Sequence, residues 1–233
     1  MNMDDFFARS AALLGEKTME TLRHTRVIIF GVGGVGSYAA EALIRTGLIH
    51  LTLVDGDTVQ PSNLNRQLPA TRSTIGMPKV EALKARLLEI NPDADIVAIN
   101  EYYHADEPFN FQLSSFNYII DAIDSVNDKT DLILYATRAR VKIFSSMGAA
   151  LRFDPTQVTT GELMSIKGDA LAKAVRARMK KLDRYPSKKV RCVYSLEQAQ
   201  RCETRGSLMQ VTAVFGLTLA SLVIQDITNQ AKL

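Results

Sequence analysis

The sequence has few of the residues on which several classes of protein depend. It contains two cysteines, Cys192 and Cys202, three histidines and no tryptophan among 233 residues. Two cysteines are too few for a disulfide framework or an all-cysteine zinc site, so we expect a reducing compartment. Hydrophobic residues make up 46% and charged residues 23%, which excludes disordered and collagen-like proteins. This length fits one α/β domain.

Targeting and membrane signals are also scarce. The first ten residues contain two aspartates and no basic cluster before an apolar run, so we predict no secretory signal and a cytoplasmic location. The stretch 208–224 is the only one apolar enough to suggest a membrane span, and it includes Gln210, Thr212 and other polar residues. Its length is borderline for the roughly 17–25 residues that a span needs. A buried core or subunit-interface helix explains it better, and we expect no stable membrane insertion.

Positive charge is concentrated in one segment. Residues 173–191 hold nine Lys or Arg and the single acid Asp183, a net charge of +8 that leaves −5 for the rest of a chain with net charge +3. Such a run is often a solvated helix face. A concentrated basic patch of this kind usually neutralises the phosphates of a polyanion, so the segment favours a polyanion as a partner.

Short runs rich in β-branched residues alternate with helical patterns over the first 150 residues. This order predicts a Rossmann-like, doubly wound α/β fold with a mostly parallel sheet. A C-terminal extension follows, with strand-like residues at 153–164 and a basic helix at 168–182. The predicted strands are 26–30, 50–54, 95–99, 117–120 and 141–145, and the predicted helices between them are 35–46, 79–90 and 127–138.

The C-terminal extension is expected to contain antiparallel strands. Pro155 and Gly161 interrupt its β-branched residues, which differs from the buried runs before it. No repeat and no long linker divides the chain, so we expect a single domain over 1–233. Its nucleotide-binding part is predicted at about 26–150, and a part for substrate and dimer contacts at about 151–233.

A glycine motif, GVGGVG at 31–36, gives the strongest local signal. It follows a predicted strand and opens a helix, where Gly31, Gly33, Gly34 and Gly36 let the backbone approach a phosphate at the helix N-terminus. Asp55 ends the second strand, where a carboxylate can accept both ribose hydroxyls. The motif alone favours a dinucleotide such as NAD.

The segment after Asp55 argues for a triphosphate instead. A long polar loop fills 56–79, where a plain βαβ unit would use a few residues. Donors in this number suit a nucleotide whose charge must be held while bonds at the α-phosphorus change. The polar residues that the loop brings to the sheet edge are Asn63, Asn65, Arg66, Gln67 and Lys79.

Two aspartates end the strand at 117–120. A carboxylate at this edge could hold the magnesium of a nucleotide, and Asp121 and Asp124 both qualify. For Asp124 the alternative of an acid at a helix N-terminus stays open. The three histidines, His24, His50 and His104, have no useful mutual spacing, and we interpret them as surface or helix-end residues.

Together these motifs resemble a known family. GVGGVG, LVDGDTVQPSNLNRQ, IGMPK and DAIDS, in this order, are similar to the ubiquitin-activating-like ThiF/MoeB/HesA adenylating enzymes, over about residues 9–215. The resemblance implies a homodimer that binds ATP with Mg²⁺. It also implies that a substrate carboxylate attacks the α-phosphate to form an acyl adenylate with release of pyrophosphate.

The resemblance also implies a set of site residues. Asp55 would hold the ribose, Arg66 and Lys79 would hold the phosphates, and Arg9 would reach the ATP site of the partner subunit. The motif places Asp124 at the magnesium, and the four glycines at the phosphates. Further nucleotide-binding positions that it implies are Asp57, Asn63 and Gln67.

Within that superfamily the sequence most resembles the tRNA threonylcarbamoyladenosine dehydratases. The segments RSAALLGEKTMETL, FDPTQV, CVYS and MQVTAVFG carry this resemblance. It implies ATP-dependent activation of the threonyl carboxylate and closure to a cyclic product, tRNA as the partner of the basic run, and room for a sulfur-relay protein partner. Cys192 and Cys202 stand alone instead of forming paired C-x-x-C ligands, so we expect no structural zinc.

Two other functions remain open at this stage. The first is an enzyme that adenylates the C-terminus of a ubiquitin-like or sulfur-carrier protein, and the second is a nicotinamide oxidoreductase. The basic segment favours RNA over a protein tail, whereas the glycine motif does not discriminate between them.

Overall fold

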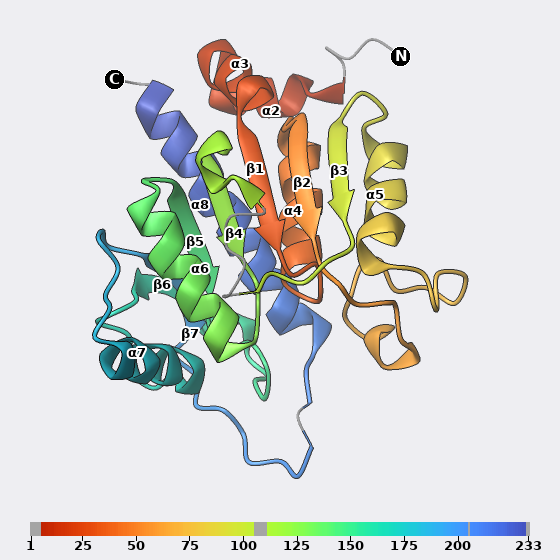
Figure 1. Cartoon of the computed structure of the whole chain (residues 1–233). Coiled ribbons are helices and arrows are strands. Elements are labelled where there is room, and N and C mark those ends of the chain that lie inside the picture. Colours follow the sequence, from red (N-terminus) through yellow and green to blue (C-terminus); the bar gives the residue numbers. More distant parts are fainter. Residues whose placement is uncertain (1–5, 105–110, 205, 232–233) are drawn as a thin grey trace.

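The computed structural model describes residues 6–104, 111–204 and 206–231. Within these ranges one sheet of seven strands has the order β3-β2-β1-β4-β5-β7-β6, and only the pair β6–β7 is antiparallel (Figure 1). The doubly wound, mostly parallel sheet predicted from the sequence is confirmed. The strands are β1 (Arg26–Phe30), β2 (His50–Val54), β3 (Asp95–Ile99), β4 (Tyr118–Asp121), β5 (Lys142–Ser146), β6 (Val158–Glu162) and β7 (Arg191–Ser195).

Helices cover both faces of the sheet (Figure 1). The first face packs against α4, α5 and α8, and the second against α6 and α7. Helices α2 and α3 lie at the end of the sheet where the parallel strands begin. The helices are α2 (Ala8–Leu14), α3 (Glu16–His24), α4 (Gly36–Thr46), α5 (Lys79–Ile90), α6 (Val126–Arg138), α7 (Ala170–Leu182) and α8 (Met209–Ala231).

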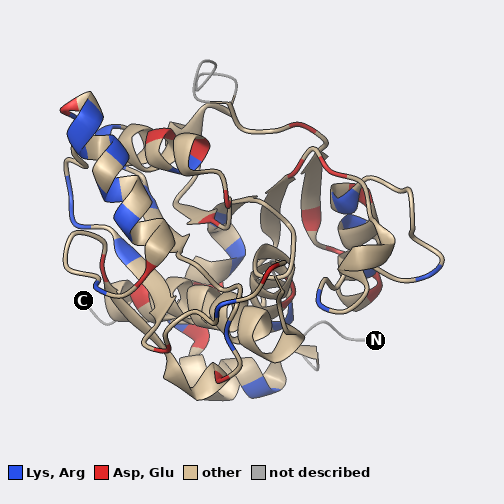
Figure 2. Ribbon diagram, turned by 90° about the horizontal axis from the view of Figure 1, so that it is seen from below, with Lys and Arg blue, Asp and Glu red and all other residues tan. Residues whose placement is uncertain are grey.

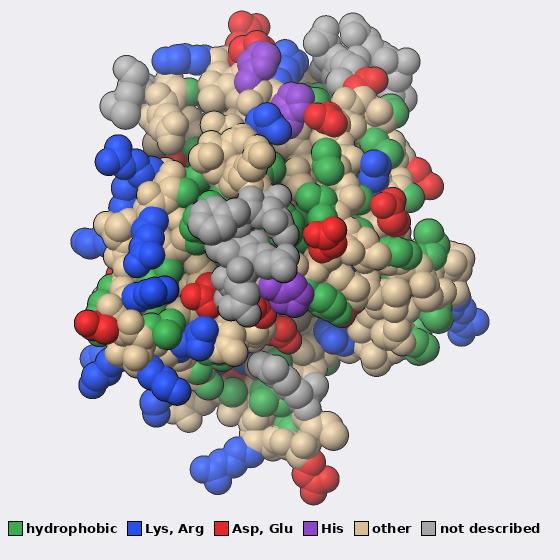
Figure 3. Space-filling view, in the orientation of Figure 1, with side chains coloured by type: hydrophobic (Ala, Val, Ile, Leu, Met, Phe, Trp, Pro, Cys, Tyr) green, Lys and Arg blue, Asp and Glu red, His purple; other side chains and the backbone are tan. Residues whose placement is uncertain are grey.

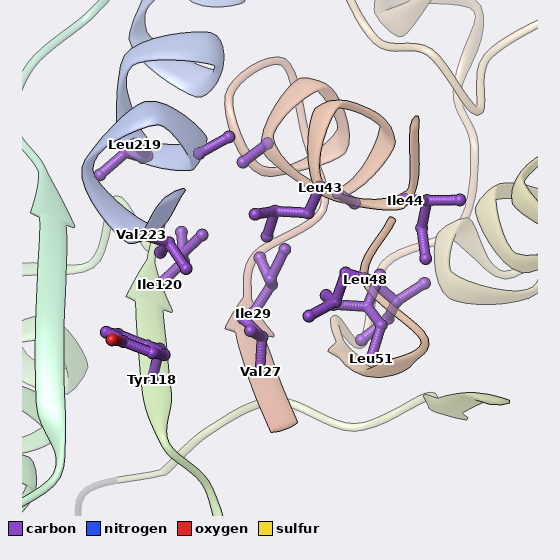
Figure 4. Close-up of a cluster of buried hydrophobic side chains, with 14 of the residues drawn as sticks. Val27, Ile29, Leu43, Ile44, Leu48, Leu51, Tyr118, Ile120, Leu219 and Val223 are labelled. Atoms are coloured by element: carbon purple, nitrogen blue, oxygen red, sulfur yellow. The ribbon is translucent and has the colours of Figure 1, made fainter. Parts of the chain in front are cut away.

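Strand β1 explains why two cores form. Its side chains alternate between the faces, so Val27 and Ile29 join the core under α4 and α8, whereas Ile28 and Phe30 join the core under α6. All four side chains are fully buried. Figure 4 shows the first core, in which residues of β1 and β4 meet α4 and α8. A shift of this strand by one residue would exchange the side chains that enter the two cores.

Helix α8 forms a large part of the first core. Its buried side chains include Phe215, Leu219 and Val223, and Gly216 lies so close to α4 that a Cβ there would meet the Val35 carbonyl oxygen at 2.2 Å. Among the described helices α8 is the one that is long and apolar enough to span a membrane, by length and composition. In this structure it packs as a core helix, in line with the interpretation of 208–224.

The strand order places a switch point between β1 and β4. From β1 the chain first moves to β2 and β3, and it later returns to β4 on the other side. Loops leaving β1 and β4 therefore diverge at the carboxyl ends of the strands, where ligands bind in folds of this kind. The carboxyl ends point downward in Figure 1, away from α2 and α3.

Candidate active site

A cavity of about 530 Å³ lies at this switch point. Its lining comes mainly from the segments that follow β1, β2, β3, β4 and β5, together with residues of α7 and α8. Figure 2 shows the molecule from this side. The cavity brings together most of the residues predicted from the sequence, namely Gly31, Gly33, Gly34, Asp55, Asp57, Arg66, Gln67, Lys79 and Asp124.

The glycine turn fits tightly between β1 and the loop after β4. Gly31 has a φ of +84°, its N–H donates to the Val54 carbonyl oxygen at 2.8 Å, and a Cβ there would meet the Ala122 carbonyl oxygen at 2.8 Å. Gly36 is buried and does not line the cavity. A Cβ on Gly36 would lie 1.9 Å from the Gly31 carbonyl oxygen, so this glycine allows α4 to begin directly behind the turn.

Asp55 is held at the end of β2 by backbone hydrogen bonds. Its Oδ2 accepts from the N–H of Val32 at 2.8 Å, and its Oδ1 accepts from the N–H of Asp57 at 2.9 Å. Burial raises the pKa of Asp55 above its usual range, against the opposing effect of nearby Lys79. The carboxylate is thus fixed beside the glycine turn.

Lys79, Asp57 and Tyr102 form a connected group. Lys79 Nζ and the Tyr102 hydroxyl both donate to the Asp57 carboxylate, each at 2.5 Å. Burial opposes ionisation of Asp57, but these two hydrogen bonds outweigh it and hold its pKa below the usual range. The hydrogen bond to Asp57 also raises the pKa of Tyr102 to about 12. Because an ammonium has three N–H donors, Lys79 retains two for a phosphate.

The loop after β2 places two further donors at the cavity. Arg66 Nη1 donates to the Ser62 carbonyl oxygen at 2.9 Å and to Asn65 Oδ1 at 2.8 Å, which orients its guanidinium. Gln67 is 8% exposed, lines the cavity next to Gly33, and its Oε1 is buried without a hydrogen-bond partner among the described residues. A buried amide oxygen left unpaired in a cavity is a position for a bound group to fill.

Asn63 and Asn65 support the loop from outside the cavity. Asn63 is buried, and its Oδ1 accepts from the N–H of Gln60 at 3.0 Å, which closes a turn in the loop. Asn65 Nδ2 donates to the Ser207 carbonyl oxygen at 2.9 Å and so ties the loop to the segment before α8. Neither residue lines the cavity, although Asn63 was expected to.

The two aspartates after β4 have different surroundings. Asp121 is fully buried and accepts hydrogen bonds from Lys129 Nζ at 2.7 Å and Ser145 Oγ at 2.6 Å, so it is not available to a magnesium ion. Asp124 is exposed and lines the cavity. The N-cap of α6 is Ser125, which disfavours the capping interpretation of Asp124.

Arg9 lies far from the cavity of its own chain. It is an exposed residue of α2, at the opposite end of the sheet (Figure 1). His24 ends α3 and His50 begins β2, where it contacts Asp95, so these two histidines lie outside the cavity as expected.

Two segments that each contribute several lining residues were not predicted from the sequence. One is the segment 101–104 after β3, which includes His104 and Tyr102, and the other is the segment 146–150 after β5. Neither carries a motif. Their position at the carboxyl ends of two predicted parallel strands was the signal that could have found them.

The cavity suits a metal ion that arrives with phosphates. Among the described residues no group of three or more His, Cys, Asp or Glu side chains could hold a metal ion. Mg²⁺ is commonly bound by one or two carboxylates together with substrate phosphates and water, and the exposed Asp124 on the cavity wall fits that donor set.

Comparison with known families agrees with this geometry. The model of the ThiF family matches residues 7–233. The chain belongs to the ThiF family.

Two relatives and one solved structure are similar to this chain over most of their length. The tRNA threonylcarbamoyladenosine dehydratase of Bacillus subtilis is 39% identical over 175 residues, which cover 75% of this chain and 69% of that protein. The protein of the same name from Haemophilus influenzae is 31% identical, over 98% of this chain and 95% of its own length. The structure of the Escherichia coli enzyme TcdA in complex with ATP superposes with a TM-score of 0.93 at 33% identity, covering 98% of this chain and 96% of that chain.

Proposed function

We propose that this protein is an ATP-dependent tRNA threonylcarbamoyladenosine dehydratase. The observation that carries the proposal is one cavity, at the switch point of the sheet, that gathers Asp55, Arg66, Lys79 and Asp124. The chain is similar over nearly its whole length to an enzyme of that name in complex with ATP. The same enzyme is also known in complex with AMP, the product expected of an adenylating reaction.

The chemistry follows from the reactivity of a carboxylate. A carboxylate oxygen of the modified adenosine attacks the α-phosphorus of ATP, pyrophosphate leaves, and an acyl adenylate forms. A side-chain nitrogen of the same substituent then attacks the acyl carbon, its proton is released, and AMP leaves with the former carboxylate oxygen. The net change in the RNA is loss of water. Ring closure depends on proximity, so the reaction needs no protein nucleophile.

The cavity residues have distinct roles in this reaction. Asp55 would hold the ribose, while Lys79 and Arg66 would stabilise the charge that develops on the phosphates. The unpaired Oε1 of Gln67 would accept a hydrogen bond from a donor group of the nucleotide, beside the glycine turn. Asn63 and Gly36 would act by shaping the loop and the turn, as their positions outside the lining indicate.

Magnesium is part of the proposal. Asp124 would face the ion bound to the nucleotide, and the ion would neutralise phosphate charge. We expect Asp124→Asn to require a higher Mg²⁺ concentration for half-maximal rate, because the variant has one carboxylate ligand fewer. Asp128→Asn, which also removes a carboxylate from the cavity wall, is the matched comparison.

The RNA partner would bind along α7. Exposed basic residues occupy this helix and the segment after it, and Figures 2 and 3 show them gathered on one side of the molecule. We call them the basic surface: Lys173, Lys180, Lys181, Arg184, Lys188, Lys189 and Arg191. Phosphate neutralisation accounts for such a cluster, and an enzyme acting on a protein carboxylate has no comparable need for it.

Assembly and location complete the proposal. A homodimer is supported by the position of Arg9, which is too far from its own cavity to act there. A cytoplasmic location is supported by the free thiols of Cys192 and Cys202. The division into a nucleotide-binding part at 26–150 and a substrate part at 151–233 is supported by the position of the basic surface, because α7 and the segment after it belong to the second part. A sulfur-relay partner rests on the family resemblance alone.

The direct test is conversion of the modified nucleoside. Purified protein, ATP and Mg²⁺ are incubated with tRNA that carries the linear threonylcarbamoyladenosine, and the nucleosides are measured by mass spectrometry. We expect ATP-dependent loss of one water from that nucleoside. Unchanged tRNA, together with pyrophosphate exchange stimulated by a ubiquitin-like protein, would favour the alternative function.

A further inference from the structure

The cavity extends beyond the groups that would hold ATP. On the side away from β2 its lining follows the end of β5, and continues with residues from α7 and from the segment before α8. We call this part the β5 wall: Gly148, Ala149, Ala150, Leu171 and Ser207. None of these side chains is charged, and no motif in the sequence marks them.

The β5 wall contains two backbone N–H groups without a partner in the described part of the chain. Gly148, Ala149 and Ala150 are half-buried, and the N–H groups of Ala149 and Ala150 form no hydrogen bond with any residue that the structure describes. Successive free N–H groups in an irregular turn are suited to an anionic oxygen. A carboxylate is a ligand of that kind.

The backbone next to this wall is held in an uncommon conformation. Leu151 has a φ of +63°, which a residue with a branched side chain rarely adopts. Two hydrogen bonds hold it there, since its N–H donates to the Gly206 carbonyl oxygen at 2.9 Å and its carbonyl oxygen accepts from the N–H of Gln200 at 2.8 Å. Conformations of this kind persist where the surroundings over-determine them, often beside a functional site.

A buried ion pair fixes the wall from behind. Arg152 is 3% exposed and Asp169 is 2% exposed, and Arg152 Nη2 donates to Asp169 Oδ2 at 3.1 Å. Gly148 is held by both partners. Its carbonyl oxygen accepts from Arg152 Nε at 2.9 Å, and its N–H donates to Asp169 Oδ2 at 3.1 Å. The remaining guanidinium nitrogen, Arg152 Nη1, is buried and has no hydrogen-bond partner within the described ranges.

The same ion pair connects the wall to α7. Asp169 is the N-cap of this helix, and its Oδ1 accepts from the N–H of Ala172 at 2.9 Å. Leu171, in the first turn, lines the cavity, whereas Lys180 and Lys181 lie exposed in the last turn. An RNA backbone bound along this helix of about 20 Å would therefore bring a nucleoside to the β5 wall.

We infer that the β5 wall is the subsite for the carboxylate-bearing substituent of the RNA nucleoside. Arg152 and Asp169 are positioning residues that hold this wall in place. The inference rests on the proposed function and adds the location of the second substrate. Free backbone N–H groups hold the carboxylate, and the small side chains leave room for its aliphatic part. The ion pair keeps this surface aligned with the nucleotide groups across the cavity.

Filling the wall tests the subsite directly. Ala150→Leu adds bulk at the wall, and Ala85→Leu adds the same bulk on the exposed face of α5, outside the cavity and away from the basic surface. For Ala150→Leu we expect the KM for modified tRNA to rise at least tenfold, while the Kd for ATP, measured by calorimetry without RNA, changes by less than about threefold. Ala85→Leu should change neither value.

The positioning role is tested by removing the guanidinium. Arg152→Met should lower kcat and raise the KM for tRNA with little change in the Kd for ATP, and Arg152→Lys should recover part of the activity. Arg86→Met is the matched control, because it removes an ion pair of α5, to Glu41, away from the wall and from the basic surface. If Arg152→Met fails to fold, Ala150→Leu still decides the location of the subsite.

The possible results distinguish a failure of this inference from a failure of the proposed function. Wild-type protein that leaves the tRNA linear would overturn both. If the wild-type protein is active but Ala150→Leu loses ATP affinity and keeps its KM for tRNA, the wall belongs to the nucleotide. That result would overturn the inference and leave the proposed function intact. An Ala150→Leu variant with unchanged constants for both substrates would overturn the inference as well.

Discussion

At the scale of single residues, the site depends on charges that are already paired before any ligand binds. Lys79 is 6% exposed and contacts Asp57, so its ammonium is oriented in advance by the protein. Preorganised donors of this kind need little rearrangement when negative charge develops. The cost of removing them should therefore fall on the rate more than on folding.

Substitution of a phosphate donor gives the first prediction. Lys79→Ala or Arg66→Ala should lower the cyclisation rate by about 10²–10³, the usual effect of removing one preorganised donor to a developing anion. Steady-state kinetics with saturating tRNA measures this decrease. Lys84→Ala, on the same helix as Lys79 but outside the cavity lining, should retain wild-type turnover. Full activity of the Lys79 and Arg66 variants would reject their assigned roles.

A residue outside the site gives a prediction for pH. Glu41 on α4 is partly buried, which disfavours its ionisation, but hydrogen bonds from Arg86 and Arg45 outweigh this and lower its pKa. Because the pKa is lower in the folded than in the unfolded state, the stabilisation is present above the unfolded pKa of about 4.3 and is lost as pH falls through the folded value.

The variant Glu41→Gln should therefore be less stable than wild type by about 1 kcal/mol at pH 7. Urea denaturation at pH 7 and at pH 3 measures the difference, which should shrink at the lower pH. A difference of equal size at both pH values would show that packing, and not charge, is responsible.

At the scale of elements, α7 combines two surfaces. Its buried side, with Ala172, Val175 and Met179, packs into the second core, and its opposite side carries the basic surface. A helix that contributes to the core has a fixed position, so the charges on its outer face have a fixed spacing. That arrangement suits a ligand with regularly spaced phosphates.

Neutralising part of the basic surface gives the prediction for this element. Replacement of Lys180, Lys181, Lys188 and Lys189 by Ala should weaken tRNA binding and flatten its salt dependence, by about one unit of slope for each phosphate that is no longer neutralised. Filter binding at several salt concentrations measures the slope. The quadruple variant should keep its affinity for ATP. The control double variant Lys17→Ala/Lys84→Ala should leave the slope unchanged. An identical slope in the quadruple variant would exclude the basic surface from RNA binding.

Much of the element structure could be predicted from the sequence, and the gaps have physical causes. The runs at 26–30 and 50–54 match β1 and β2 to the residue, because strands buried on both faces are continuously apolar. Strand β7 was not predicted, since Arg191 and Ser195 leave it a run of only three apolar residues and its partners β5 and β6 are distant in sequence. The helices α2 and α3 were also not predicted.

The site was predictable where a motif names the residue. Asp55, Arg66 and Lys79 belong to such motifs and line the cavity. The burial of Lys129 could not be predicted, because it arises from the pairing of β4 with β5. A lysine on a polar helix pattern is normally exposed, whereas Lys129 becomes fully buried once Asp121 and Ser145 lie beside it.

At the scale of the whole molecule, the proposed role of Arg9 would make assembly part of catalysis. A single chain places this arginine at the end of the sheet opposite its own cavity. In a dimer with two-fold symmetry, the same contact occurs twice, so each subunit would complete the site of the other.

Mixed dimers test this arrangement. Arg9→Ala and Lys79→Ala should each be nearly inactive alone, whereas an equimolar mixture with subunit exchange should recover about one quarter of the active sites, since half of the dimers are mixed and each has one intact site. Activity before and after exchange is the measurement. Without recovery, Arg9 does not act across the interface.

The place of α8 in the chain affects how the protein is made. Its side chains Phe215, Leu219 and Val223 close the first core, which also contains residues of β1 and α4 near the beginning of the sequence. A nascent chain on the ribosome can pair its first five strands long before α8 has been synthesised. During that interval the part of the sheet face that α8 later covers leaves apolar side chains exposed, which is the kind of species that aggregates or recruits chaperones. The rate of translation over the last quarter of the sequence should therefore influence the yield of soluble enzyme.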